Sequence, residues 1–385
     1  MTGFTSTIDY TTAQASGCQD PSRFQEVTIT EIEHLWTVAY RKAFPAAELV
    51  TMRQGEVHFL FDMGSDEHSG QCARTVAAFG RVSGSVSIRD AVYQAGFPMK
   101  TVGYQAFDRG HMMPHSGGGQ FGPNIYLQDR ALNRGWSMQG RRYRALERKA
   151  LKVPEGVLFC HLMYSDLTDV PTLVDLGFVS TTAIEVDTFI NRTDLLIGAY
   201  FDPSKLSDAE LTSILDVLTS SQFGDIGEET ARFYLEDKGI SPVSLGDSGM
   251  PRTASRQDLD IVALVEGELV AFEVKTTYIE KRAGTLTRLG NLHRPKLRRK
   301  AARSDLLPSH DQGSPDYVSQ RVHSIVEVDG SMECRVIAVD LRGLKLQEFA
   351  LNHRGEISGP YSGVVDCRDF VRQGMAEILQ HRLHL

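Results

Sequence analysis

FDRGH at residues 107–111 and ALNRGW at residues 131–136 decide the fold of the first half of this chain of 385 residues. Residues 101–107 alternate as a strand does, and residues 115–122 form a glycine-rich loop. Residues 131–151 repeat apolar side chains at helical spacing and predict one long helix. The order strand, loop, helix therefore brings the histidine and the asparagine of the two quoted stretches onto neighbouring elements.

A second pair of stretches, DLDIVA at residues 258–263 and FEVKT at residues 272–276, predicts a β-hairpin in the second half of the chain. Glu-Gly-Glu at residues 266–268 separates the two apolar runs and is typical of a tight turn. Alternate residues of a strand share a face. We therefore expect Glu273 and Lys275 to point the same way.

Asp260 is expected on the neighbouring strand of this hairpin. Its carboxylate and that of Glu273 can converge on one Mg²⁺ or Mn²⁺, since both ions prefer oxygen ligands. Asp258 lies two residues earlier and shares a face with Asp260, so the pattern leaves either aspartate as the ligand.

A compact helix is predicted over residues 228–238, where Gly239 ends it. Glu228, Ala231 and Leu235 stand at positions i, i+3 and i+7 and so share one inward face of that helix. We therefore expect Glu228, rather than Glu229, to complete the carboxylate set.

The composition is that of a globular chain, with 41% hydrophobic and 23% charged residues. No apolar run has the length that crossing a bilayer requires, so no membrane association is expected. Five scattered cysteines without a CxxC pair argue against structural zinc and for a reducing, cytoplasmic setting. The N-terminal residues 1–22 lack the basic and apolar regions of a signal peptide, and we predict disorder there.

Positive charge is concentrated in two segments, although the chain as a whole has a formal net charge of -8. Residues 130–152 hold eight Arg and Lys against one acid, and residues 280–303 hold nine against one. Each basic segment follows one of the two motifs, and phosphate-backbone binding needs such local cation density. The alternative is an ordinary solvated helix face. The residues expected to contact nucleic acid are Arg134, Arg141, Arg282, Arg298 and Arg299.

The first motif, together with residues 117–119 and 124–128, resembles the DRGH region of the DNA/RNA non-specific endonucleases of the His-Me finger (ββα-metal) superfamily. The resemblance covers residues 80–165. It implies that His111 is the general base, which suits an imidazole with an unperturbed pKa near ~6.5. It also implies that Asn133 opens a helix and holds the cation, and that Arg109 contacts the phosphate.

One departure from that family concerns a glutamate that commonly follows the asparagine by one to two helical turns. The position eight residues after Asn133 is Arg141, and the nearest glutamate is Glu147. Either the helix begins later or another residue has taken the acidic role. Asp108 is expected to anchor the loop rather than to bind metal.

The second motif, together with a glutamate-bearing helix before it, resembles the PD-(D/E)xK, or restriction endonuclease-like, superfamily over residues 222–345. That resemblance implies that Asp260, Glu273 and Glu228 hold Mg²⁺ or Mn²⁺. It favours Asp260 over Asp258, because the family's acid directly precedes the Ile-Val-Ala run. Lys275 is implied to orient or activate the attacking water.

These expectations define an α/β (α+β) chain of two nuclease domains. A ββα-metal domain is predicted over residues 23–180, a connecting segment over 181–220, and a mixed-sheet PD-(D/E)xK domain with a C-terminal extension over 221–385.

The predicted function is metal-dependent, weakly sequence-specific hydrolysis of DNA, with RNA as a further candidate substrate. The two resemblances also imply a role in prokaryotic (phage) defence or as a toxin effector. Two alternatives stay open: one domain cuts while the other binds or senses nucleic acid, or neither cuts and the chain is a binding adaptor. Control by an activating partner or by homo-oligomerisation is also left open.

Overall fold

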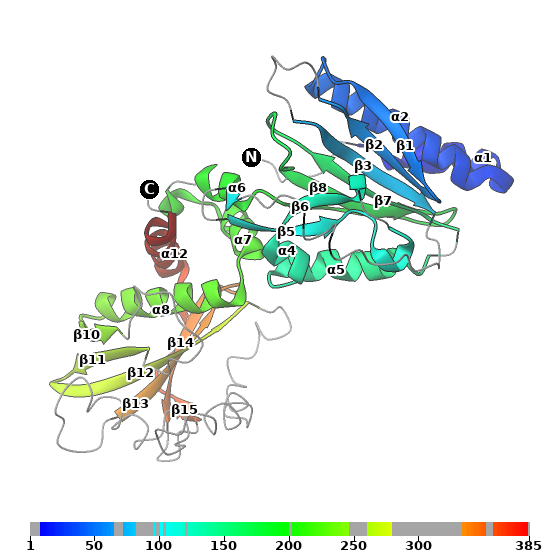
Figure 1. The fold of residues 1–385 in the computed structure, drawn as a ribbon. Coiled ribbons are helices and arrows are strands. Elements are labelled where there is room, and N and C mark those ends of the chain that lie inside the picture. Colours follow the sequence, from blue (N-terminus) through cyan, green and yellow to red (C-terminus); the bar gives the residue numbers. More distant parts are fainter. Residues whose placement is uncertain are drawn as a thin grey trace. The chain divides into compact units, whose positions relative to one another are not determined.

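The computed structural model describes residues 8–64, 72–81, 92, 96, 101–102, 105–119, 122–153, 155–199, 202–245, 260–278, 333–351 and 357–383. It shows a mixed α+β chain with several sheets (Figure 1). The chain divides into two compact units. The first consists of Met1–Ala199 with Asp216–Thr219, and the second of Tyr200–Leu215 with Ser220–Leu385.

The first unit contains a six-stranded antiparallel sheet in the order β1-β2-β3-β7-β8-β9. Strands β3, β7 and β8 are almost continuously buried, as expected where both faces of a sheet are covered. The strands are β1 (Leu49–Gln54), β2 (Val57–Asp62), β3 (Arg74–Arg81), β7 (Val157–Met163), β8 (Leu173–Val179) and β9 (Ile184–Ile190).

Strand β9 corrects the prediction of a mere connecting segment over residues 181–220. It pairs with β8 from Leu173↔Ile190 to Val179↔Ile184 and completes the sheet. The same segment also forms helices: α6 (Thr193–Ala199), the 3-10 helix η4 (Pro203–Lys205) and α7 (Asp208–Val217). The N-terminus of α7 is capped, because Ser207 and Glu210 exchange the two hydrogen bonds of a capping box.

Helices α1 (Tyr10–Gln19) and α2 (Phe24–Ala43), joined by η1 (Pro21–Arg23), pack on one face of the sheet. Tyr10 stacks on Phe159 with ring centroids 4.6 Å apart, and its hydroxyl donates to Asp175. Disorder through residue 22 was therefore the wrong prediction for α1. Contacts with strands more than 140 residues away, which no local pattern reveals, hold this helix.

The opposite face of the sheet is covered by α5 (Met138–Ala150) and the strands that precede it. These are β4 (Thr101–Val102), β5 (Gln105–His111) and β6 (Ile125–Asp129), with the short helices η2 (His115–Gly117), η3 (Gly122–Asn124) and α4 (Arg130–Arg134). Figure 1 shows α2 and α5 on opposite sides of the sheet.

The predicted single helix over residues 131–151 is interrupted. Gly135 takes the left-handed conformation (φ 67°, ψ 32°) and ends α4, while Trp136 donates its N–H to the Ala131 carbonyl. Together with the bond from Gly135 N–H to the Leu132 carbonyl, this is a Schellman motif. Ser137 then caps α5 by accepting from the Gly140 N–H.

The second unit contains a mixed sheet in the order β10-β11-β12-β13-β14-β15, with β16 on β14. Strands β12 and β13 run parallel and the remaining neighbours antiparallel. The strands are β10 (Pro242–Leu245), β11 (Ile261–Val265), β12 (Glu268–Thr277), β13 (Glu333–Asp340), β14 (Lys345–Leu351), β15 (Ile357–Pro360) and β16 (Val365–Asp366).

Helices α8 (Ser220–Asp237) and α12 (Arg368–Leu383) accompany this sheet, and α8 contacts both β12 and α12. The predicted hairpin is confirmed: β11 and β12 are joined by Glu266 and Gly267, with φ of 52° and 91°. Positive φ at both turn positions matches the twist of antiparallel strands. Among the helices described, none combines the length and apolar composition that crossing a bilayer requires.

Candidate active sites

The hairpin of β5 and β6 positions the first candidate site. Its register pairs His111 with Ile125 and Asp108 with Gln128. Because successive side chains alternate across a strand, Arg109 and His111 share one face of β5 and Asp108 occupies the other. A Cβ at Gly110 would lie 2.3 Å from Gln128 Oε1, so only glycine lets the Gln128 side chain cross the strand there.

Asp108 joins β5 to α4 through three side chains of that helix. Arg134 donates to both carboxylate oxygens, at 2.6 and 3.0 Å, and Arg130 and Asn133 each donate at 3.1 Å. Burial raises the pKa of Asp108, but the hydrogen bonds from Arg134, Asn133 and Arg130 outweigh burial and hold the pKa below its usual value. Asp108 is thus an ionised anchor, and these contacts make it the residue that orients Asn133.

The contact with Asp108 fixes how the Asn133 amide is turned. Its nitrogen donates to the carboxylate, so its oxygen is the atom left for another partner, and no described residue donates to that oxygen. A single neutral oxygen suits Mg²⁺ or Mn²⁺ ions that keep most of their waters. Asn133 therefore fits the ligand role expected of it, supported by a carboxylate behind it.

The start of α4 is held by Asp129, which was not among the residues singled out from the sequence. Asp129 accepts from the Leu132 N–H at 2.7 Å and from Gln105 Nε2 at 2.9 Å. Burial raises the pKa of Asp129 to about 6, against the lowering effect of these hydrogen bonds. Asp129 is best placed to cap the helix that carries Asn133.

The position at which the resembled family has a glutamate, eight residues after Asn133, is Arg141 in this chain. Arg141 lies exposed on α5, and Glu147 lies further along the same helix. Burial raises the pKa of Glu147, although Arg144 and Arg148 oppose this. Its carboxylate acts on Tyr143 and Cys160, which belong to the core beneath α5. Among the described residues, the hydrogen-bonded partner of Asn133 is Asp108 rather than Glu147.

Part of the positive charge on α5 is neutralised within the first unit. Arg142 pairs with Asp216 at 2.7 Å and with Asp187 at 3.5 Å, and Lys149 pairs with Glu185. Arg134 is engaged by Asp108 but keeps 47% of its side chain accessible.

Four of the predicted residues lie outside the described part of the chain: Asp258, Arg282, Arg298 and Arg299.

The second candidate site is built on the hairpin of β11 and β12. The register of Ile261 with Phe272 sets Asp260 opposite Glu273. Asp260 Oδ2 accepts from the Val274 N–H at 2.7 Å, and Lys275 Nζ donates to Glu273 Oε2 at 2.9 Å. Glu273 is almost fully buried, whereas 30% of the Lys275 side chain is accessible. The site therefore opens to solvent at the lysine.

Helix α8 brings Glu228 to this hairpin. Burial lowers the pKa of Lys275, but the carboxylates of Glu273, Asp260 and Glu228 outweigh burial and hold the pKa above its usual value. Glu229, by contrast, pairs with Arg232 at 2.7 Å. Of the two neighbouring glutamates, Glu228 is the one whose charge acts on Lys275.

A glycine explains the close approach of α8 to β12. A Cβ at Gly227 would lie 1.8 Å from Thr276 Oγ1, so any larger residue would push the helix off the strand. Gly227 directly precedes Glu228, and a glycine at this position in the sequence could have been recognised as a sign of close helix–strand packing.

The chemistry of this cluster is three carboxylates around one ammonium group. Carboxylate oxygens are the ligands that Mg²⁺ and Mn²⁺ prefer, and an ammonium beside them stays protonated and can donate to a phosphate. Within the described residues, no group of three or more His, Cys, Asp or Glu side chains is placed so that it could hold a metal ion. In this structure Glu273 is instead paired with Lys275.

Trp136 is a candidate contact residue that the sequence interpretation missed. It is 46% exposed, and the Arg134 guanidinium lies 4.9 Å from its ring centroid. An exposed tryptophan directly after a helix-ending glycine was the available signal.

No model of a known protein family matches this chain, and no curated protein matches it.

Proposed function

We propose that this protein is a metal-dependent nuclease that hydrolyses phosphodiester bonds of DNA, with RNA as a further candidate substrate, with low sequence specificity and one active site in each unit. The observation that carries the proposal is that Lys275 donates to Glu273 while the charges of Asp260 and Glu228 act on the same lysine. We assign the first unit to the His-Me finger nucleases and the second to the PD-(D/E)xK nucleases. A role in phage defence or as a toxin effector is proposed from these resemblances.

In the second unit, Asp260, Glu273 and Glu228 would hold Mg²⁺ or Mn²⁺. The cation supplies stabilisation of the charge that develops on the phosphate oxygens. Lys275, held protonated by its three neighbours, donates a hydrogen bond to the phosphate or to the attacking water. Its accessible side chain lets it meet a substrate that the buried Glu273 cannot reach.

In the first unit, the Asn133 amide oxygen would hold the cation, turned outward by Asp108. His111 takes a proton from water, and Arg109, on the same face of β5, donates to the phosphate. Asp108 is a positioning residue, because it touches Asn133 and not the substrate.

One observation favours a second version, in which the second unit cuts and the first binds nucleic acid. Arg141 stands where the resembled family has its glutamate, and the charge of Glu147 acts on Tyr143 and Cys160 of the core. The basic face of α5 and the exposed Trp136 would then serve binding alone.

The direct test is to incubate the purified full-length protein with supercoiled plasmid, linear DNA and RNA in Mg²⁺ or Mn²⁺. We expect cleavage that EDTA abolishes and that restored metal recovers. The matched control is the same chain carrying His111→Ala and Asp260→Ala together, which should not cut. Absence of cleavage by the wild-type chain with either metal would defeat the proposal and leave the binding adaptor.

Nucleic-acid binding by the first unit is expected to quench tryptophan fluorescence. The chain has two tryptophans, and Trp36 is fully buried while Trp136 is 46% exposed. A base stacked on Trp136 would contribute about 1–3 kcal/mol to binding. Titration with single-stranded oligonucleotide in EDTA should quench the emission of the wild type. It should leave Trp136→Phe unquenched and weaken its binding little, whereas Trp136→Ala should bind about tenfold more weakly. Unchanged emission and affinity in all three proteins would remove Trp136 from the interface.

A further inference from the structure

Arg74, at the start of β3, is a buried cation that forms no side-chain ion pair within 4.0 Å among the described residues and leaves one of its donor nitrogens unused. Its side chain retains 3% exposure. Nε donates to Tyr40 Oη at 2.7 Å, and Nη1 donates to the carbonyls of Asp166 and Thr168 at 2.7 and 2.5 Å. Nη2 is buried and has no hydrogen-bond partner in the part of the chain described. All three acceptors are neutral groups, while Asp62 is the register partner of Arg74 on β2 and the charge of Arg74 acts on the Asp166 carboxylate.

The surroundings hold this guanidinium in one orientation. It lies 4.1 Å from the ring centroid of Tyr164 and 4.4 Å from that of Phe44. Its indirect link to a carboxylate runs through the Tyr40 hydroxyl, which donates to Asp62 at 2.8 Å. A buried donor that is left without a hydrogen bond is costly. The Nη2 of Arg74 is therefore available to donate to a ligand oxygen, such as that of a phosphate.

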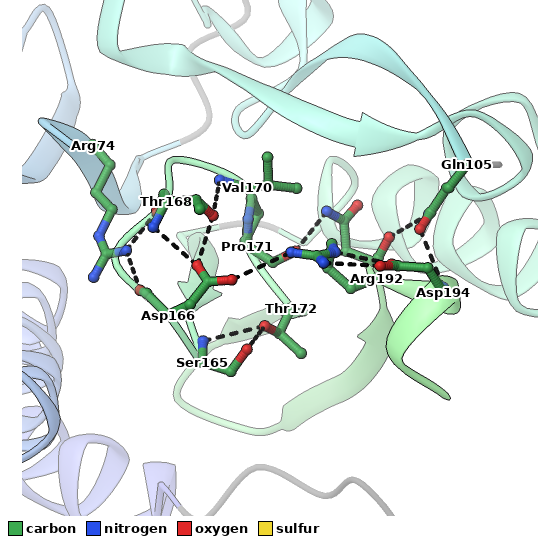
Figure 2. Close-up of polar contacts among 11 residues, drawn as sticks. Arg74, Gln105, Ser165, Asp166, Thr168, Val170, Pro171, Thr172, Arg192 and Asp194 are labelled. Atoms are coloured by element: carbon green, nitrogen blue, oxygen red, sulfur yellow. Dashed lines mark hydrogen bonds and ion pairs between the residues drawn. The ribbon is translucent and has the colours of Figure 1, made fainter. Parts of the chain in front are cut away.

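The loop that Arg74 contacts is also held from its other side. Figure 2 shows Asp166 between Arg74 and Arg192: Arg192 Nη1 approaches the Asp166 carboxylate at 3.5 Å and the same guanidinium binds Asp194. The Asp194 N–H in turn donates to Gln105 Oε1 at 3.4 Å. The carbonyls that orient Arg74 are thus set by a network rather than by a loose loop.

A cavity of about 450 Å³ lies beside Arg74 in the first unit. Its volume falls within the range of small-molecule sites, which are mostly apolar with a few convergent polar groups. Its walls are largely apolar, with Met52, Phe61, Ile125, Tyr126 and Tyr164 among them. Arg74, Thr75 and Asp169 supply the polar lining, and Ile125 is the register partner of His111.

We propose that this cavity is a binding site for a nucleoside monophosphate. The phosphate meets the unpartnered Nη2 of Arg74, the planar base lies among the apolar and aromatic walls, and Asp169 accepts from a ribose hydroxyl or a base amino group. The same chemistry has two sources: a free mononucleotide, or one nucleotide of a bound strand. The site is distinct from the proposed metal ligands, and its occupation does not depend on cleavage.

The test is isothermal titration of the full-length protein in EDTA with AMP, GMP, CMP and UMP, and with adenosine as the probe that lacks phosphate. We expect at least one monophosphate to bind at one site, and its nucleoside to bind at least about tenfold more weakly, since charge-assisted hydrogen bonds are the strong ones. Met52→Trp fills the cavity and should abolish binding. Arg53→Trp, the next residue on β1 with an exposed side chain, is the matched control and should bind as the wild type does.

Arg74→Lys should weaken binding at least about tenfold, because lysine lacks the forked donors of arginine. If Arg74→Lys does not fold, the comparison of Met52→Trp with Arg53→Trp still tests whether the cavity binds the nucleotide. A third arm uses a 5′-phosphorylated oligonucleotide of four nucleotides. Binding of mononucleotides identifies a free ligand, and binding of the oligonucleotide alone, lost in Met52→Trp, identifies a nucleotide of the strand. The proposal is overturned if neither the mononucleotides nor the oligonucleotide bind the wild type. It is also overturned if Met52→Trp binds these ligands as well as Arg53→Trp does. Either result leaves the metal-dependent cleavage test untouched.

Discussion

Replacing His111 by alanine is expected to lower cleavage by the first unit by about 10²–10⁴-fold, the usual contribution of a positioned general base. The reason is that the proposed site offers one neutral metal ligand, Asn133, and therefore depends on the imidazole to make the nucleophile. The full chain carrying Asp260→Ala, in which the second site is silenced, is the proper background. Initial rates of plasmid nicking in Mg²⁺, with and without His111→Ala, give the effect.

The matched control for this measurement is His34→Ala, because His34 is exposed on α2 and outside both candidate sites. It should leave the rate in the Asp260→Ala background unchanged. If Asp260→Ala alone already removes all cleavage, His111 supports no site of its own. The version in which the first unit binds and the second cuts would then stand.

The hairpin of the second site was predictable because its signals are local. Two apolar runs flank Glu266 and Gly267, and both adopt the positive φ that a tight hairpin turn requires. Helical spacing alone also distinguishes Glu228, whose charge acts on Lys275, from Glu229, which pairs with Arg232; that Glu228 holds a cation stays a prediction.

The features that were missed depend on contacts between distant residues or on a single backbone conformation. Helix α1 has weak amphipathic character, and the burial of Tyr10 against β7 and β8 holds it in place. The interruption at Gly135 occurs inside a run that favours helix, because one glycine in the left-handed conformation outweighs the average propensity of its neighbours. Arg74 gave no sequence signal, since its significance lies in a buried Nη2 that has no hydrogen-bond partner among the described residues.

Replacing Glu273 by glutamine is expected to lower cleavage by the second unit at least about 100-fold. The reason is that a ligand of the cation is lost, and the cation is expected to stabilise the charge of the transition state by several kcal/mol. The measurement uses the His111→Ala background and Mn²⁺, and a Mn²⁺ titration should show weaker binding. Lys275 also loses its hydrogen-bonded carboxylate. Since 30% of that lysine is accessible, we expect the free energy of unfolding to fall by only about 1 kcal/mol.

The helix glutamates provide the matched pair for this prediction. Glu228→Gln should reduce both cleavage and Mn²⁺ affinity, because its charge acts on Lys275. Glu229→Gln removes an equally buried carboxylate one residue away, but one that is paired with Arg232, and should change neither. Equal effects of the two helix variants would show that the loss comes from disturbing α8. Undiminished Mn²⁺ affinity in Glu273→Gln would show that the carboxylates around Lys275 bind no cation, and that their role is to hold the lysine in place.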